Sequence, residues 1–254
     1  MRSEMRYFGL RNSVNVLAFK LRNHDKERYE CPICGYRGPF LDKVTYNGIR
    51  KHARCPNCSA LERHRLQFLV LQEVFGGKET AHLRMLHVAP EAFFRDFFSQ
   101  RFDQYETADL KMKGADHIVD LQHLPFSDNS YDFVFASHVL EHIPDDRKAI
   151  SEIRRILRPN GVAMLPVPIY SEKTVEFSEP DPNEFGHVRA PGLDYFDRYQ
   201  PYFSKVERFD SGSQPEKYQV FVYQEDRRPS KTENLALTSM PCRKLTDVVP
   251  VCYV

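Results

Sequence analysis

The sequence lacks any apolar run long enough to cross a membrane. A membrane-spanning helix needs roughly 20 mostly apolar residues in a row, and no stretch of the chain approaches that length. The N-terminus also lacks the apolar core and cleavage site of a signal peptide. We therefore expect a cytoplasmic protein without a membrane partner. With 254 residues, 41% of them apolar, the chain can form one large domain and a small additional one.

The sequence also has almost no net charge, with a formal value of +1 at pH 7. The charge is uneven, because residues 1–70 contain 14 Lys and Arg against 6 Asp and Glu, which gives +8 and leaves −7 for residues 71–254. A basic segment of this kind is either a solvated surface, the more frequent case, or a region that attracts phosphates and other polyanions. RNA is therefore a possible partner of the N-terminal region. The oligomeric state is not indicated by the sequence.

Glycine is missing from Met85–Glu91 (MLHVAPE), where a cofactor loop is expected. This segment has the form of a short buried strand followed by the helix-like run AFFRDFFSQRF. Loops that hold the polar end of a nucleotide-type cofactor usually contain glycines, which let the backbone approach closely. The segment is thus either a variant cofactor loop or only the end of a strand.

Four of the six cysteines form two closely spaced pairs. They are Cys31 and Cys34 in CPICGYRG, and Cys55 and Cys58 in RCPNCSALERHR. Two Cys-x-x-Cys turns at this separation can close a tetrahedral four-thiolate zinc site, a spacing typical of zinc ribbons. Because such a site has no open coordination position, we expect structural Zn²⁺. Two disulfides or a redox-active pair are the alternatives, which a cytosolic location and the presence of two pairs disfavour.

Regular elements are expected throughout the rest of the chain. Ser59 and Glu62 have the spacing of a capping box, and the following helix continues to Gly76. From residue 83, apolar segments alternate with helix-like ones, which predicts an α/β fold with a mostly parallel sheet and helices on both faces. The segments are LRMLHVA, residues 91–102, YETADL, HIVDL, YDFVFAS, residues 146–157 and GVAMLPVPI, with YFSKVERFD and KYQVFVYQE as the final pair of strands.

The chain accordingly divides into four predicted parts. These are a basic segment with the zinc ribbon (1–58), a connecting helix (59–77), the α/β domain (78–226) and a C-terminal tail of uncertain structure (227–254).

Polar residues follow the predicted strands, at the edge where parallel sheets bind ligands. Asp109 lies 22 residues after His87, close to the spacing at which dinucleotide-binding folds place an acid for ribose hydroxyls. Asp120 and then Ser137 follow the next two strands. Helix caps and loop acids are equally common explanations for a single residue of this kind.

The run from residue 117 to residue 165 resembles the centre of class I S-adenosylmethionine-dependent methyltransferases, in their small-molecule (type 11-like) branch. The family motifs D-x-x-x-L-P-F, F-D-hydrophobic-hydrophobic, L-x-H and L-K-P-G-G have counterparts here, in the same order, at Asp120–Phe126, Tyr131–Phe135, Leu140–His142 and Leu157–Gly161. The resemblance extends over roughly residues 83–225. It implies a Rossmann-like, doubly wound, mostly parallel seven-stranded sheet, and makes residues 78–226 a methyltransferase domain.

The resemblance also implies a cofactor site. Asp109 would hold the ribose hydroxyls, Asp120 the adenine amino group and Leu121 the ring. In the loop, His87 replaces the family's acid and Ala89 its first glycine, and a carboxylate at the position of the last glycine would accept from the cofactor's ammonium group. The implied S-adenosylmethionine site is His87, Ala89, Pro90, Glu91, Asp109, Leu110, Asp120, Leu121 and Ser137.

The acceptor region is expected between residues 170 and 199, where charged and aromatic residues are dense enough for a lid over a polar acceptor. Glu176, His187 and Arg189 are candidates there, with His187 as a possible general base. His138, near the expected methyl group, completes the catalytic candidates. His142 is expected to be a packed helix histidine.

Three functions follow from these observations. The first is methyl transfer to an oxygen or nitrogen of a polar small molecule or sugar. The second is methylation of RNA held by the basic zinc ribbon, and the third is a non-catalytic, zinc-stapled binding scaffold whose cofactor site has degenerated.

Overall fold

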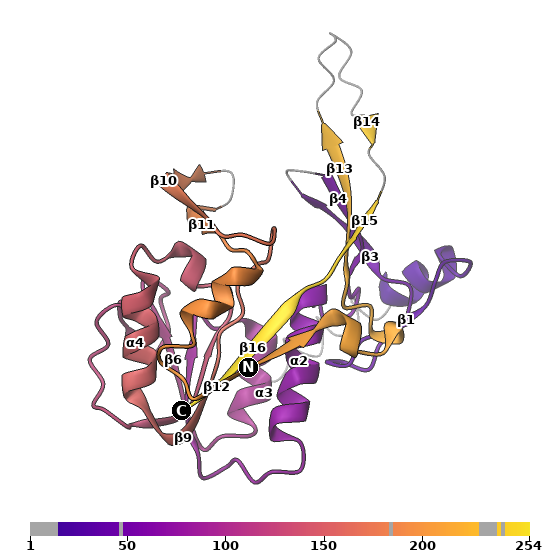
Figure 1. Cartoon of the computed structure of the whole chain (residues 1–254). Coiled ribbons are helices and arrows are strands. Elements are labelled where there is room, and N and C mark those ends of the chain that lie inside the picture. The colour runs from indigo at the N-terminus through magenta and orange to yellow at the C-terminus, as the bar shows by residue number, and fades with distance from the viewer. Residues whose placement is uncertain (1–14, 46–47, 183–184, 229–237, 240–241) are drawn as a thin grey trace. The chain divides into compact units, whose positions relative to one another are not determined.

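A seven-stranded sheet forms the centre of the unit made by Val74–Phe209 and Val248–Val254 (Figure 1). In spatial order its strands are β12 (Lys205–Asp210), β16 (Val248–Tyr253), β9 (Leu157–Met164), β8 (Tyr131–Ala136), β5 (Arg84–Val88), β6 (Gln104–Asp109) and β7 (His117–Ile118). Strands β9, β8, β5, β6 and β7 are parallel neighbours, whereas β16 runs antiparallel to β9. The predicted mostly parallel, doubly wound sheet is therefore confirmed.

Two helices cover opposite faces of this sheet, α3 (Ala92–Ser99) and α4 (Asp146–Ile156). Successive side chains of a strand point to opposite faces, and the contacts of β5 follow this rule. Leu86 belongs to the core cluster that contains the α4 residue Ile150, while His87 packs its ring on Phe98 of α3. Because both faces are covered, the central strands β5 and β8 are buried on both sides, which explains their mostly hydrophobic sequences.

The face under α3 is a layer of aromatic rings that encloses His87. Phe98 and Phe135 lie 5.2 and 5.3 Å from the His87 ring between centroids, and Nδ1 of His87 is 2.9 Å from the hydroxyl of Tyr105. The side chain is fully buried, and this burial lowers the pKa of His87 to about 3. His87 is therefore a neutral core residue of the sheet.

The last strand of the sheet comes from a segment that the sequence analysis left as a tail. Strand β16 pairs with β9 in the register Val251 to Met164 and Cys252 to Ala163. The segment KYQVFVYQE, expected to supply this strand, instead contains β13 (Val222–Arg228), which pairs with β4 (Gly48–Arg54) in the other unit. The predicted boundaries at residues 226 and 227 thus differ from the observed division of the chain.

The second unit combines the N-terminal part of the chain, up to Glu73, with the insertion Asp210–Asp247 between β12 and β16. Its strands are β1 (Tyr29–Glu30) paired with β2 (Arg37–Gly38), and β3 (Leu41–Thr45), β4, β13, β14 (Thr238–Ser239) and β15 (Arg243–Leu245) in a second sheet. It also contains most of α2 (Glu62–Phe75) and the 3-10 helices η4 (Ser211–Ser213) and η5 (Glu216–Tyr218). The predicted connecting helix corresponds to α2.

Outside its main sheet, the first unit has a hairpin and two short 3-10 helices. They are β10 (Val175–Asp181) with β11 (His187–Ala190), η1 (Leu140–His142) and η3 (Leu193–Arg198). The hairpin forms a separate two-stranded sheet (Figure 1).

The structure describes residues 15–45, 48–182, 185–228, 238–239 and 242–254. Residues 1–14 of the predicted basic segment, and residues 229–237 and 240–241 of the predicted tail, lie outside them. Among the described residues, no helix has the length and apolar character needed to cross a membrane.

Shortening a side chain of β16 should destabilise the protein. Val251 is fully buried, so Val251→Ala should lower the free energy of unfolding by about 2–3 kcal/mol, because it removes apolar contacts and leaves a cavity. Val44 is 79% exposed, so the matched variant Val44→Ala should change it by less than about 0.5 kcal/mol. Denaturant unfolding measures both, and equal effects would contradict the placement of β16 in the core.

Acid should destabilise the fold through His87. Its pKa of about 3 in the fold is below the ordinary 6.5, so the unfolded chain binds a proton that the folded one does not. The contribution to stability is complete above about pH 6.5 and is lost as the pH falls toward 3. Between pH 7 and pH 5 this loss is about 2 kcal/mol.

The variant His87→Phe keeps an aromatic ring but cannot titrate. Between pH 7 and pH 5, the free energy of unfolding of the unaltered protein should decrease by about 2 kcal/mol more than that of His87→Phe. The exposed residue His82 provides the control, since His82→Phe should keep the original pH dependence. Parallel curves for the unaltered protein and His87→Phe would show that His87 does not govern the response.

Candidate cofactor edge and cysteine cluster

The four cysteines of the two Cys-x-x-Cys pairs converge on one point. The sulfur atoms of Cys31 and Cys58 are 3.6 Å apart, and those of Cys34 and Cys55 are 3.7 Å apart. Four sulfurs at about 2.3 Å from a tetrahedral Zn²⁺ would be about 3.8 Å from one another, whereas a disulfide needs about 2.05 Å. The cluster therefore has the size of a four-thiolate zinc site, and all four cysteines are free of disulfides.

The two cysteine turns have the same backbone geometry. Gly35 donates its N–H to the carbonyl of Cys31 and Ser59 donates to that of Cys55, both at 2.9 Å. Both residues have a left-handed backbone conformation, with φ of +70° at Gly35 and +64° at Ser59. Ser59 thus closes the second cysteine turn and does not cap α2, so the predicted capping box is wrong. The imidazole of His64 instead accepts from the N–H of Leu61 at 3.1 Å.

A buried arginine lies beside the cysteine cluster. Arg65 is 0% exposed, and its guanidinium donates to the carbonyls of Ala53, Ala60 and Gln219. It also lies 4.4 Å above the ring centroid of Phe40. Arg65 therefore connects β4, the second cysteine turn and the segment after η5, and is not a surface cation that could contact a polyanion.

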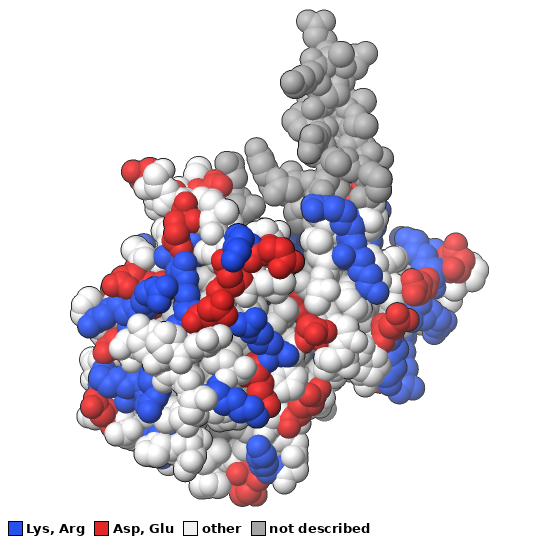
Figure 2. Space-filling view, viewed as in Figure 1, with Lys and Arg blue, Asp and Glu red and all other residues white. Residues whose placement is uncertain are grey.

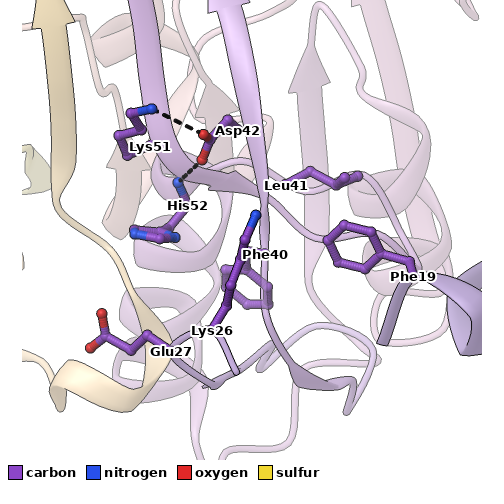
Figure 3. A pocket seen from close by; sticks show the side chains of 8 residues that line it. All are labelled: Phe19, Lys26, Glu27, Phe40, Leu41, Asp42, Lys51 and His52. Carbon is purple, nitrogen blue, oxygen red and sulfur yellow. Dashed lines mark hydrogen bonds and ion pairs between the residues drawn. The ribbon is translucent and has the colours of Figure 1, made fainter. Parts of the chain in front are cut away.

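The same unit contains a pocket of about 650 Å³ that no cysteine lines (Figure 3). It is lined by Phe19, Lys26, Glu27, Phe40, Leu41, Asp42, Lys51 and His52. Lys51 forms ion pairs with Asp42 at 3.3 Å and with Glu225 at 3.2 Å, so its charge is already compensated. On the face drawn in Figure 2, acidic and basic side chains alternate. This face therefore gives no support to an RNA-binding surface.

The loop after β5 adopts the backbone of a cofactor loop even though it lacks glycine. Ala89 has φ of +48°, a left-handed conformation that glycine adopts far more readily. Its N–H donates to the carbonyl of Ala108 at 2.8 Å, which ties the loop to β6. Pro90 is buried, and Glu91 follows as the N-cap residue of α3. Alanine thus occupies the conformation that the family's first glycine would occupy.

Acidic residues end the next two parallel strands. Asp109 ends β6, and its Oδ1 accepts the N–H groups of Lys111 at 2.7 Å and Met112 at 2.8 Å. Within the part of the chain that the structure describes, Oδ2 of Asp109 accepts no hydrogen bond. Asp120 follows β7, and hydrogen bonds from the backbone and side chain of Gln122 lower the pKa of its carboxyl group.

Two leucines accompany these acids. Leu110 is 57% exposed beside Asp109, whereas Leu121 is 5% exposed and belongs to the core. Leu110 therefore offers an apolar side-chain surface at the edge, and Leu121 only its backbone.

The end of β8 leads into a group of titratable side chains. Ser137 is buried, and His138 has φ of +54° with its Nδ1 3.5 Å from a carboxylate oxygen of Glu141. The His142 and His187 rings meet edge to face at a centroid distance of 4.6 Å. Burial, and secondarily His142, lowers the pKa of His187 to about 4, so this imidazole is neutral at neutral pH. The buried Glu141 was not identified from the sequence.

Arg189, one of the predicted catalytic residues, is buried and makes several hydrogen bonds within the protein. The side chain is 3% exposed, and its NH1 and NH2 groups donate to the carbonyls of Leu140, Ile143 and Pro144 at 2.6–3.0 Å. Its Nε donates to Glu176 at 3.0 Å. Two of the three predicted acceptor-region residues, Glu176 and Arg189, are thus bonded to each other, and Arg189 attaches β11 to the turn that contains η1.

Comparison with known proteins agrees with this geometry. A family model described as a methyltransferase domain matches residues 96–165. An uncharacterized protein of Methanocaldococcus jannaschii is 44% identical over 52 residues, which are 20% of this chain and 23% of that protein. Demethylmenaquinone methyltransferase of Bacillus velezensis is 34% identical over 83 residues, 33% of this chain and 30% of the relative. The chain spans only 14–34% of the lengths of the curated relatives that it matches here.

A solved structure supports the fold. The S-adenosylmethionine-dependent methyltransferase from Mesorhizobium loti is 14% identical and has a TM-score of 0.50, with 76% of this chain and 100% of that chain covered. The strand order, the motif-bearing segment and the family model point in the same direction. The chain contains a domain of the class I S-adenosylmethionine-dependent methyltransferase family, preceded by a four-cysteine cluster with the geometry of a zinc site.

Proposed function

We propose that this protein is an S-adenosylmethionine-dependent methyltransferase that acts on an oxygen or nitrogen of a polar small molecule or sugar. The observation that carries the proposal is the series Ala89, Asp109 and Asp120, which follows three adjacent parallel strands, β5, β6 and β7. Carboxyl ends of parallel strands meet at one edge of a sheet, where ligands of this architecture bind. This placement supports a single site that contains these residues.

The side chains at this edge fit the cofactor's chemistry. Oδ1 of Asp109 accepts two backbone N–H groups, which fix the carboxylate, and Oδ2 would accept from the ribose hydroxyls. The exposed Leu110 would supply apolar contact to the adenine ring, and Asp120 would accept from its amino group. Glu91, at the start of α3, would accept from the ammonium group in place of the acid that His87 replaces.

When bound, S-adenosylmethionine supplies an electrophilic methyl group on a sulfonium. The protein's task is to align the acceptor and to exclude water. Ser137 and His138 follow β8, the neighbour of β5 in the sheet, and would line the acceptor side of the cofactor. An unprotonated imidazole of His138 or His187 would be able to take a proton from an acceptor hydroxyl or amine. Arg189 would act indirectly, by fixing the position of the η1 turn.

The alternatives differ in what they bind. Methyl transfer into RNA needs a cationic surface, and the described basic side chains give no support to one. A scaffold without catalytic function would have lost the cofactor. Transfer of a labelled methyl group from S-adenosylmethionine into a fractionated small-molecule extract, with total RNA as a parallel substrate, separates the two enzyme functions. Label confined to RNA would overturn the choice of a small-molecule acceptor.

Removing the carboxylate after β6 should weaken cofactor binding. Asp109→Ala removes a charge-assisted contact worth about 1–3 kcal/mol, which corresponds to roughly 5- to 150-fold in the dissociation constant for S-adenosylmethionine. Calorimetry on protein that has been stripped of ligand and refolded measures this change.

Asp103 lies exposed shortly before β6, so Asp103→Ala serves as the matched control and should bind like the unaltered protein. If neither S-adenosylmethionine nor S-adenosylhomocysteine binds at about millimolar concentration, the enzyme proposal fails and the scaffold function replaces it.

We further propose that the cysteine cluster binds one structural Zn²⁺. Cys55→Ser should abolish zinc binding and unfold the surrounding unit, because metal binding and folding of small zinc-binding regions are coupled. Cys242 is exposed and outside the cluster, so Cys242→Ser should keep the metal. Metal analysis of freshly purified, unchelated protein measures both variants, and less than about half an equivalent in the unaltered protein would refute the zinc assignment.

A further inference from the structure

A second cluster of metal-binding side chains lies near the end of β8. It consists of Glu141 and His142 in η1 and His187 in β11, whose potential ligand atoms all lie within 4.8 Å of one another. Ligand atoms on one divalent transition-metal ion, at about 2.0–2.2 Å from it, are about 3.0–3.6 Å apart. Small side-chain rotations are therefore sufficient to place all three on one ion.

The composition of this cluster suits a transition metal. Two imidazoles and one carboxylate form the ligand set of many catalytic zinc sites and of non-haem iron sites, where the remaining coordination positions stay open to water or substrate. Ca²⁺ and Mg²⁺ prefer oxygen ligands, so a set with two nitrogens favours zinc, iron or a similar ion. The cysteine cluster differs in kind, because its four sulfurs would leave no open position.

His187 provides a second, independent observation. Its side chain is 7% exposed, and within the described residues its buried Nδ1 has no hydrogen-bond partner. A buried ring nitrogen without a partner is costly, since it loses its interaction with water and gains none in the protein. A metal ion bound by this nitrogen would remove that cost.

The burial of Glu141 favours a cation at the same place. Its side chain is 1% exposed, and the ion pair with Nδ1 of His138 spans 3.5 Å. A buried carboxylate is stable when a cation or several hydrogen bonds compensate its charge. An ion between Glu141 and the two histidines would add to the interactions that this carboxylate already makes, with His138 as a neighbour of the ligand carboxylate.

Arg189 fixes the two chain segments that contribute these ligands. It lies two residues after His187 on the same buried face of β11. Its NH1 group donates to the carbonyls of Leu140 and Ile143, which flank Glu141 and His142 in the sequence, at 2.8 and 2.6 Å. The ligand-bearing turn and strand are thus joined before any ion binds, which lowers the entropic cost of completing a site.

We propose that Glu141, His142 and His187 bind one divalent transition-metal ion, separate from the ion of the cysteine cluster and with open coordination positions. The proposal concerns metal binding alone, so it does not depend on methyl transfer. The alternative is that the contact between the two imidazole rings is only packing.

Metal stoichiometry distinguishes these alternatives. Zinc-loaded full-length protein, dialysed against buffered micromolar Zn²⁺ without S-adenosylmethionine, should contain about two equivalents of zinc by elemental analysis. His187→Ala and Glu141→Gln should each reduce this to about one. His142 is exposed, so His142→Ala should lose the second equivalent and still fold, which keeps the test valid if the two buried variants fold poorly.

His82→Ala, which removes an exposed histidine outside the cluster, should retain both equivalents. Co²⁺ added to protein that holds only one equivalent of zinc should give ligand-field absorption without a thiolate charge-transfer band, because the ligands of the second site are nitrogen and oxygen. A single equivalent in the unaltered protein, or two equivalents in His142→Ala, would overturn the proposal. Since no step requires S-adenosylmethionine, a failure here is distinguishable from a failure of the methyltransferase proposal.

Discussion

Two buried guanidinium groups organise the two units of this protein. Arginine keeps its charge when buried and has five N–H donors, so the chain must bring several acceptors to each one. Around Arg65 these acceptors are carbonyls from residues 53 and 60 and, more than 150 positions later, from Gln219. Around Arg189 they are carbonyls of the η1 turn and the carboxylate of Glu176. Removing either arginine would leave buried carbonyls unsatisfied in segments that lie far apart in the sequence.

Arg65 also needs negative charges nearby to offset the burial of its own charge. The carboxylate of Glu62 and the sulfurs of Cys31, Cys55 and Cys58 act on this guanidinium as negative charges, against the pKa-lowering effect of its burial. On the zinc proposal, four thiolates and Zn²⁺ together carry a charge of −2, and Arg65 is the buried cation beside them. The N-terminal cysteines therefore depend on the insertion Asp210–Asp247, because Gln219 completes the coordination of the arginine. This interdependence explains why the cysteine-containing unit is built from two separate parts of the chain.

The sequence predicted the sheet well between residues 83 and 164, because each strand there carries a local apolar pattern and a family motif. It failed for the last strand. The segment KYQVFVYQE has the alternation expected of a strand and does form β13. Its sequence pattern does not show which strand it pairs with, and that strand is β4, about 170 residues earlier. The true strand contains Pro250, and proline argues against a central strand. The structure accommodates it because pairing with β9 starts at Val251, while the carbonyl of Pro250 accepts from Leu165.

The burial of His87 was also not predictable from the sequence. Successive side chains of β5 point to opposite faces of the sheet, and His87 points to the face that carries the aromatic layer. The sequence does not show which residues of the strand point to which face.

The edge of the sheet divides into two chemically different halves because β5 has β6 on one side and β8 on the other. On the β6 side are the carboxylates of Asp109 and Asp120, which suit the hydroxyl and amino groups of a nucleoside. On the β8 side are His138 and Glu141, near the imidazole of His187. A methyl group offers neither charge nor hydrogen bonds to hold, so the rate of its transfer depends on how firmly the acceptor is positioned. On the proposed function, the rigid strand ends would hold the cofactor, and the acceptor side would consist of a turn and a hairpin strand that Arg189 joins. Changes that alter acceptor choice are therefore expected around β11 and η1, whereas changes at the ends of β6 and β7 would alter cofactor affinity for every acceptor alike.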